Sequence, residues 1–311
     1  MKEEPLSRAR PMLDVTFKAI FGQEGKEHLL LSLLNSVLER PGFVRLEEVE
    51  YLNPYLGYEG EKEKHPAVDV RARDKLGRQF NVEVQVGYQL TWPQRMLYYW
   101  SKMYAHQLMQ GDEYKKLNPA ICVVFLGFSL DKREGYMRRV VAWDETHGVA
   151  FSEHLDLVLV EMPKFSQADL LKVSDDRERW LCFLKEGQTM ATDVVERWKT
   201  PEIIEAMEEL KKLSNDRMWR EGYNDREKAL RDYISMVKES YQEGREEGRE
   251  EGREEGREEG REEEKREMAL RLMEMGMGME QITKVTGYSA EAVAKLQAQA
   301  VGEPSGTKEE G

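Results

Sequence analysis

Residues 66–86, PAVDVRARDKLGRQFNVEVQV, contain two short alternating segments joined by a turn sequence. Valine or alanine occupies every second position of each segment, which is typical of β-strands with one apolar face. DKLG at 74–77 fits a type I turn with glycine where positive φ is needed, the three-residue loop of a hairpin. The stretch therefore predicts a β-hairpin with its apolar face toward the core and a polar face opposite. The apolar positions are Val68, Val70 and Ala72 in the first strand and Val82, Val84 and Val86 in the second.

The turn also fixes which residues face each other. If Asp74 pairs with Arg78, Asp69 lies directly across from Glu83. Gln85 falls on the same face, because side chains alternate with a period of two. The two carboxylates are then expected about 5 Å apart, an arrangement that costs free energy unless something neutralises them.

Two explanations for the paired acids stay open on the hairpin alone. Hard oxygen ligands on neighbouring strands suit a divalent cation such as Mg²⁺ or Mn²⁺. Alternatively, Arg71 and Arg73 share the polar face and satisfy the acids in a solvated salt-bridge network.

An acid ending one strand, followed by Glu83-Val84-Gln85 in the next, resembles the D…(D/E)-x-K core of restriction-endonuclease-like nucleases, with Gln85 in place of lysine. Further stretches are similar to the bacterial recombination-promoting nuclease and putative transposase family of the PD-(D/E)xK superfamily, and the resemblance covers roughly residues 11–190. These stretches are LDVTFKAIFG (13–22), DVRARDKLGRQFNVEVQ (69–85), QRMLYYWSKMYAHQLMQGDEYKKLNPAI (94–121) and VEMPKF (160–165).

The resemblance implies an α/β fold, a restriction-endonuclease-like core with a mixed central sheet flanked by helices, followed by an α-helical C-terminal extension. It implies a metal-dependent DNA endonuclease that hydrolyses phosphodiester bonds in DNA recombination or in mobile elements. Asp69, Glu83 and the Val84 carbonyl would hold Mg²⁺ or Mn²⁺, and Gln85 would complete the catalytic set. The alternative is a weakly active or inactive DNA-binding or assembly protein that retains the nuclease scaffold.

Five further residues are candidate accessory groups. Asp14 and Lys18 lie one turn apart on a predicted first helix, where the resemblance places a polar residue near the metal and the plain alternative is an exposed ion pair. Gln94 and Tyr98 form a Q-x-x-x-Y pattern similar to a motif of some exonucleases, although the aromatic residues of this helix also suit core packing. Arg95 beside the acids suits a phosphate group.

The remaining pattern alternates helices and strands. The predicted helices span 12–39 with a break at 22–25, then Pro93 to about Gln110, then 166–240, and the predicted strands span 46–56, 119–130, 137–143 and 156–162. Residues 119–130 are almost continuously apolar, which indicates a central strand covered on both faces. We assign residues 1–190 to the nuclease domain and 191–242 to a helical extension.

A repeat of EEGR occupies residues 243–264. Its five glycines each cost about 1 kcal/mol relative to alanine in a helix, so we expect a flexible or marginally helical spacer. Residues 265–299 return to amphipathic pattern and predict a small helix-turn-helix-like tail, either DNA-reading or an assembly bundle. Residues 300–311 are expected to be disordered.

The net charge is −13, but residues 243–264, with twelve Glu and five Arg, contribute −7 of it. Residues 1–130 carry seventeen basic and seventeen acidic side chains, so bulk charge neither indicates nor excludes DNA as the partner. Cys122 and Cys182 lack metal-ligand spacing and are expected as buried thiols in a reducing cytoplasm. No signal peptide or membrane span is expected, and the C-terminal helices are a candidate route to a homo-oligomer.

Overall fold

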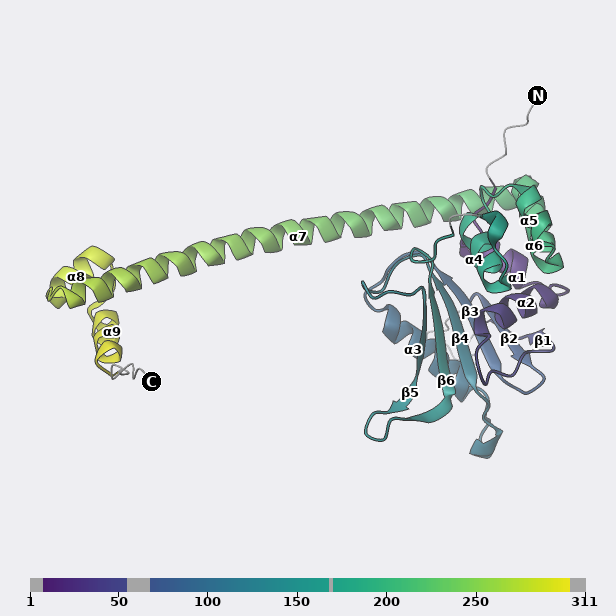
Figure 1. The fold of residues 1–311 in the computed structure, drawn as a ribbon, viewed down its shortest axis with the longest axis horizontal. Coiled ribbons are helices and arrows are strands. Elements are labelled where there is room, and N and C mark those ends of the chain that lie inside the picture. The colour runs from purple at the N-terminus through teal and green to yellow at the C-terminus, as the bar shows by residue number, and fades with distance from the viewer. Residues whose placement is uncertain (1–7, 55–67, 168–169, 303–311) are drawn as a thin grey trace, which may run out of the picture. The chain divides into compact units, whose positions relative to one another are not determined.

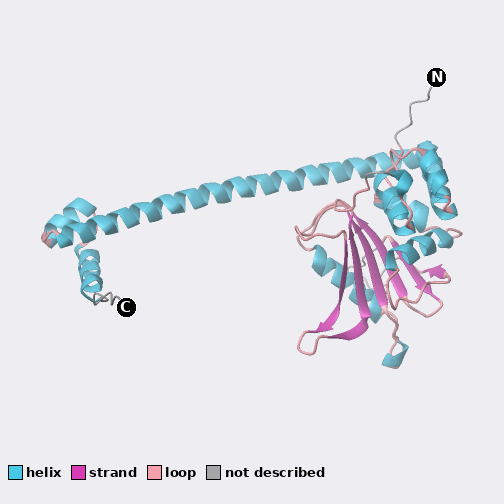
Figure 2. Cartoon of the chain, viewed as in Figure 1, coloured by secondary structure: helices cyan, strands magenta, loops and turns pink. Residues whose placement is uncertain are grey.

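Six strands form one mixed sheet in the part of the chain that the computed structural model describes, residues 8–54, 68–167 and 170–302. The strand order is β1-β2-β3-β4-β6-β5, with β3, β4 and β6 parallel to one another and the remaining pairs antiparallel. Figures 1 and 2 show helices on both sides of this sheet, which confirms the predicted α/β class. The strands are β1 (Val49–Tyr51), β2 (Val70–Asp74), β3 (Gln79–Gln85), β4 (Ala120–Leu126), β5 (Met137–Asp144) and β6 (Val149–Glu161).

The β2–β3 hairpin has the predicted turn and register. Gly77 has φ of +80°, and its N–H donates to the Asp74 carbonyl at 3.0 Å. Val70 lies opposite Val82, so the next position beyond the ladder sets Asp69 across from Glu83. One expectation for the apolar face was wrong, because the chain leaves the sheet before Val70 and Val68 packs into the core on the other face.

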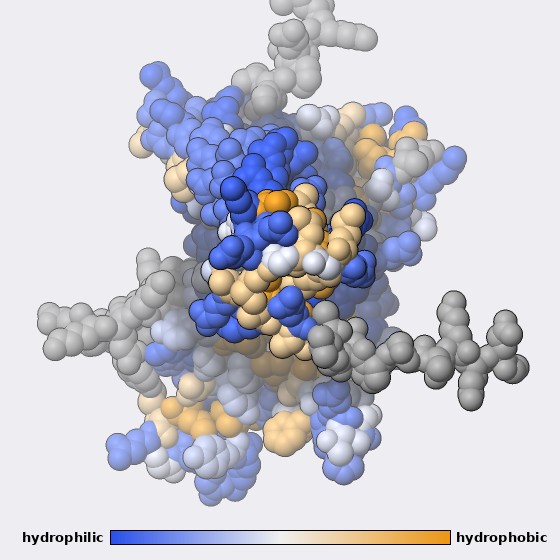
Figure 3. All heavy atoms as spheres, turned by 90° about the vertical axis from the view of Figure 1, so that its left-hand side faces the viewer, coloured by the Kyte–Doolittle hydropathy of each residue, from blue (hydrophilic) through white to orange (hydrophobic). Residues whose placement is uncertain are grey.

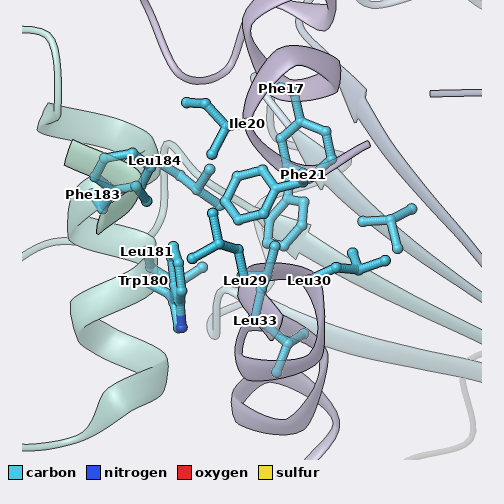
Figure 4. Close-up of a cluster of buried hydrophobic side chains, with 14 of the residues drawn as sticks. Phe17, Ile20, Phe21, Leu29, Leu30, Leu33, Trp180, Leu181, Phe183 and Leu184 are labelled. Carbon is cyan, nitrogen blue, oxygen red and sulfur yellow. The ribbon is translucent and has the colours of Figure 1, made fainter. Parts of the chain in front are cut away.

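The sheet packs against two hydrophobic cores, and the first fills the space between the sheet and the helices α1 (Asp14–Phe21), α2 (Glu27–Leu38) and α4 (Asp176–Glu186). Figure 4 shows aromatic rings from α1 and α4 meeting over the leucines of α2. Phe21 contacts Trp180 edge to face, with ring centroids 5.4 Å apart. This core also includes buried residues of α5 (Thr192–Trp198) and α6 (Pro201–Asn215).

The second core lies under α3 (Trp92–Ala105), on the opposite face of the sheet. Trp92, Met96 and Met103 are buried there against alternate residues of β4. All seven residues of β4 are buried, which confirms the prediction of a central strand covered on both faces. The helix ends earlier than the predicted Gln110, because the chain turns after Ala105.

The other predicted boundaries need smaller corrections. Within the predicted strand 46–56, the described residues form a strand at β1 alone. Residues 55 and 56, like residues 66 and 67 of the hairpin stretch, lie outside the described residues. β6 begins seven residues before the predicted 156, since it continues outward as a hairpin with β5. The predicted helical stretch 166–240 is broken into α4, α5, α6 and the start of α7 (Arg217–Glu274). Two short 3₁₀ helices complete the list, Tyr114–Lys116 and Leu170–Lys172.

The chain divides into two compact units, residues 1–234 and 235–311. Residues 191–234 belong to the first unit, where Trp198, Leu210 and Tyr223 are part of the first core. Residues 191–234 therefore belong to the same compact unit as the six-stranded sheet.

The second unit contains the rest of α7, α8 (Met279–Thr286) and α9 (Ala290–Gly302), joined by a small core of Ala269, Ile282 and Val293. Figure 3, turned so that this unit faces the viewer, shows apolar side chains gathered within a mainly hydrophilic surface. The exposed apolar residues of the unit include Met268, Met275, Met279 and Val285. Residues 300–302, expected to be disordered, belong to α9, and 303–311 lie outside the described residues.

The EEGR repeat is helical throughout, within the single helix α7. Of the two alternatives, a flexible or a marginally helical spacer, the structure has the helical one, and the expectation of low stability came from treating the repeat as an isolated peptide. Helix formation is limited mainly by nucleation, and here the packed turns at either end of α7 provide the nucleus. Glu and Arg are also good helix formers.

No helix among the described residues combines the length and the apolarity needed to cross a lipid bilayer.

Candidate active site

Asp69 and Glu83 lie together where β2 ends beside β3. In a continuing ladder the Val84 N–H would pair with a backbone carbonyl, but it donates instead to Asp69 Oδ2 at 3.0 Å. The N–H and C=O groups of one strand residue point to the same side, so the Val84 carbonyl also faces the Asp69 side of β3. The end of the ladder therefore presents two carboxylates and one carbonyl, the three groups predicted to hold the metal.

Glu83 is buried and Asp69 is partly buried, with 12% of its side chain exposed, and this burial raises the pKa of both carboxyl groups. Glu83 is 6% exposed, and burial followed by the nearby Asp69 charge raises the pKa of its carboxyl to about 8. Burial also raises the pKa of Asp69, opposed by the Val84 hydrogen bond and by Lys18. Lys18 Nζ lies 3.6 Å from Asp69 Oδ1, so the predicted accessory lysine of α1 does reach the acids. Arg95 and Lys18 both act to lower the pKa of Glu83, but burial and the Asp69 charge outweigh them.

The proposed salt-bridge network with Arg71 and Arg73 does not form. Arg71 donates to Gln79 at 2.9 Å and to the Asn53 carbonyl, and Arg73 pairs with Glu50 at 2.5 Å. The physical reason is that the two arginines are taken up by these partners, while Asn81 and Glu83 are buried. A solvated network is therefore unavailable to the acids.

Gln85 connects the hairpin to α3. Its amide oxygen accepts a hydrogen bond from Arg95, and its Nε2 donates to the Gly87 carbonyl at 2.7 Å. Arg95 also donates to Gln89 at 2.8 Å and lies over the ring of Tyr99. The guanidinium of Arg95 thus stands beside the residue that replaces the usual lysine.

The two ends of the Q-x-x-x-Y pattern face away from this arrangement. Gln94 is exposed, and Tyr98 is exposed with Lys102 stacked on its ring. Tyr99, also on α3, lies close enough to the acids to be affected by them. Burial, and then the charge of Glu83, raises the pKa of its hydroxyl. Helical spacing explains the difference, because Arg95 and Tyr99 are four residues apart and share a face.

Asp14 is bound by a residue that sequence reasoning missed. Arg226 of α7 donates to both of its carboxylate oxygens, with Nε at 2.9 and 3.0 Å. The two residues are 212 positions apart. The sequence pattern that pointed to this face of the helix was the helical spacing of Arg226, Ala229, Leu230 and Tyr233. Asp14 is therefore paired with the Arg226 guanidinium. The negative charge of Asp14 nevertheless contributes to raising the pKa of Asp69.

The donor set fits a hard divalent cation. Two carboxylates this close in a largely buried place are costly when the nearby Lys18 and Arg95 do not fully compensate them, and a bound cation would relieve that cost. Among the described residues no group of three or more His, Cys, Asp or Glu side chains is placed to hold a metal ion. A site with two carboxylates and a carbonyl suits Mg²⁺, which keeps several of its waters and takes further oxygens from substrate phosphates.

A mixed sheet flanked by helices, with opposed acids at the end of a central hairpin, defines a restriction-endonuclease-like protein. The chain belongs to the PD-(D/E)XK nuclease family transposases, whose family model matches residues 11–240. Comparison with curated proteins and with solved structures found no match. Membership in this family indicates a role in nuclease or transposition chemistry and implies DNA binding.

Proposed function

We propose that the chain is a Mg²⁺- or Mn²⁺-dependent DNA endonuclease that hydrolyses phosphodiester bonds in DNA recombination or in mobile elements. The observation that carries the proposal is the buried pair of opposed acids, Asp69 and Glu83, of which Glu83 has its pKa raised to about 8. Perturbed carboxyl groups of this kind are concentrated at functional sites. We place the activity in the cytoplasm.

Asp69, Glu83 and the Val84 carbonyl hold the ion in this proposal. When bound, the ion polarises the scissile phosphate and lowers the pKa of an attacking water. Lys18, 3.6 Å from Asp69, keeps that carboxylate ionised and oriented. Glu83 releases its proton on loading, because a cation replaces the missing positive charge.

Arg95 and Gln85 act as a unit. The amide of Gln85 is engaged by Arg95 and by the Gly87 carbonyl, so we assign it a positioning role. The Arg95 guanidinium then supplies, from α3, the positive charge that lysine supplies in the D…(D/E)-x-K pattern. A planar guanidinium can contact two phosphate oxygens at once, which suits charge developing on a phosphoryl group.

The second candidate is a DNA-binding or assembly protein with little turnover, which the amide at position 85 favours because it cannot donate a proton as lysine does. Titration calorimetry with Mn²⁺ separates the two candidates. The endonuclease binds Mn²⁺ through Asp69 and Glu83, and the loss of binding in Glu83→Gln identifies the site.

Incubation of the purified chain with supercoiled plasmid, with and without Mg²⁺, tests turnover directly. We expect nicking that requires Mg²⁺ and is absent in Asp69→Asn. Glu50→Gln removes an exposed acid of the neighbouring strand β1 and is the matched control, which should nick at the wild-type rate. Equal nicking by wild type and Asp69→Asn would remove the acids from the mechanism.

We also propose that the second unit mediates self-association. Its exposed apolar residues Met268, Met275 and Met279 support this proposal. Sedimentation of the full chain against residues 1–242 measures the contribution of the unit.

A further inference from the structure

A cavity of about 340 Å³ opens beside the residues that directly follow Glu83. It is lined in part by Val84 and Gln85 of β3 and by the loop that leads to α3. Its polar lining includes Arg95, Arg226, Gln85 and Gln89, and its apolar lining includes Leu230 and Tyr233. All of these residues belong to the first unit, residues 1–234.

One face of α7 forms a wall of this cavity. Arg226, Leu230 and Tyr233 follow one another at intervals of four and three residues, so they lie on the same side of the helix. Arg226 is tied to Asp14 on α1, and the Tyr233 hydroxyl donates to the Tyr88 carbonyl at 3.2 Å. A Cβ atom on Gly87 would lie only 2.8 Å from the Tyr233 ring, so the helix approaches the loop as closely as a glycine allows. The wall is fixed at both ends.

The lining combines two kinds of chemistry. Arg95 and Arg226 bring guanidinium groups from two helices, and the Nε of Arg95 is buried without a hydrogen-bond partner among the described residues. The hydrogen bonds of Arg226 to Asp14 use Nε and Nη2, and a guanidinium has five N–H donors, so its Nη1 side can still reach a phosphate. On the same wall as Arg226, Leu230 and the Tyr233 ring offer an apolar surface on which a base can rest.

The cavity volume fits one nucleotide. It lies at the lower end of the roughly 300–1,000 Å³ typical of small-molecule sites. We infer that this cavity binds a single unpaired nucleotide of the DNA strand beside the scissile phosphate, its phosphate between Arg95 and Arg226 and its base against Leu230 and Tyr233. The inference rests on the proposed endonuclease function and makes single-stranded or locally unpaired DNA the preferred substrate. A paired base cannot enter without leaving its stack.

Fluorescence anisotropy with a labelled single-stranded 12-mer and the same sequence as a blunt duplex, in EDTA, tests the inference on the full chain. We expect the single strand to bind about tenfold more tightly than the duplex, the order of one base–aromatic stacking contact. Arg226→Ala and Leu230→Trp should each weaken single-strand binding about tenfold, the first by losing a phosphate contact and the second by filling the cavity.

Arg231→Ala is the matched control, because Arg231 is an exposed arginine of the same helix that does not line the cavity. It should change single-strand affinity less than about twofold, since a surface charge outside the site acts only through screened long-range attraction. Arg226→Ala also leaves Asp14 without its ion pair, and this loss could unfold the protein. If the Arg226→Ala variant unfolds, Leu230→Trp still tests the inference. Equal affinity for strand and duplex, or Leu230→Trp binding the strand like wild type, overturns the inference.

The binding experiment contains no divalent metal and measures no cleavage, so its failure is distinct from failure of the endonuclease proposal. Plasmid nicked in Mg²⁺ by a protein that binds strand and duplex equally would overturn the nucleotide site alone. The expected binding pattern without cleavage of any DNA would support the nucleotide site and overturn the hydrolase.

Discussion

The buried carboxyl of Glu83 makes the stability of the metal-free protein depend on pH. Its ordinary pKa is 4.5, and in the folded protein burial and the Asp69 charge raise the pKa to about 8. Between these values the folded state holds a proton that the unfolded chain has released. The free energy of unfolding therefore falls as pH rises through this interval. Asp69 acts in the same direction, since its pKa is also raised.

We predict that metal-free wild type is more resistant to urea at pH near 5.5 than near 8, and that Glu83→Gln removes most of this difference. The amide keeps the shape of the carboxyl but does not ionise. Urea midpoints at the two pH values measure the effect. Mg²⁺ should raise the wild-type midpoint more at the higher pH, because loading displaces a proton. A wild-type midpoint that increases with pH would contradict the raised pKa.

Arg95 and Gln85 allow a charge-exchange test. We predict that Arg95→Gln lowers the single-turnover cleavage rate about 10²-fold, as expected when one donor to the developing charge is removed. The double variant Gln85→Lys with Arg95→Gln returns the cation to the position where related nucleases carry it, and should recover at least tenfold of the loss. Gln85→Lys alone sets two cations side by side and should be slow. A double variant no faster than Arg95→Gln would show that the position of the charge matters more than its presence.

At the scale of elements, the hairpin was predictable because its determinants are local. The turn at 74–77 fixes the register within a few residues, and alternation then places Asp69, Glu83 and Gln85. The burial of that face was not predictable, because it depends on α3 crossing over the strands. The pairing of Asp14 with Arg226 depends on folding of the whole unit and has no local signal.

The helix across the EEGR repeat also depends on its surroundings in the chain. Propensity describes an isolated segment, whereas these residues continue a helix already started by packed turns on either side. The five repeat glycines have open space where a Cβ would lie.

Replacing Gly244, Gly248, Gly252, Gly256 and Gly260 by alanine should therefore strengthen α7. Each exchange favours the helix by up to about 1 kcal/mol. We expect a higher melting temperature for the tail in circular dichroism and an unchanged cleavage rate, because the glycines lie in the second unit. Slower cleavage by a well-folded quintuple variant would show that the glycines are required for function rather than tolerated.

At the scale of the whole molecule, the first unit should be sufficient for chemistry. We predict that residues 1–242 cleave plasmid at a rate close to that of the full chain, since both acids, Arg95 and the α7 wall are retained. We expect assembly and DNA affinity to change only through the missing second unit, and sedimentation and anisotropy measure these changes. A chain ending at residue 225 keeps Tyr223 in the core but loses Arg226, Leu230 and Tyr233. It should bind single strands about tenfold more weakly.

The core of the first unit joins residues from its two ends, and this has a consequence for synthesis on the ribosome. The Ala9 N–H donates to Ser214, and the Arg10 N–H donates to Tyr223. Helix α1, which carries Lys18, therefore completes its packing only after residue 223 has emerged, and Arg226 follows three residues later. The nascent chain exposes both acids of the hairpin long before it can position them. The proposed endonuclease is in this way kept inactive until residue 226 has been made.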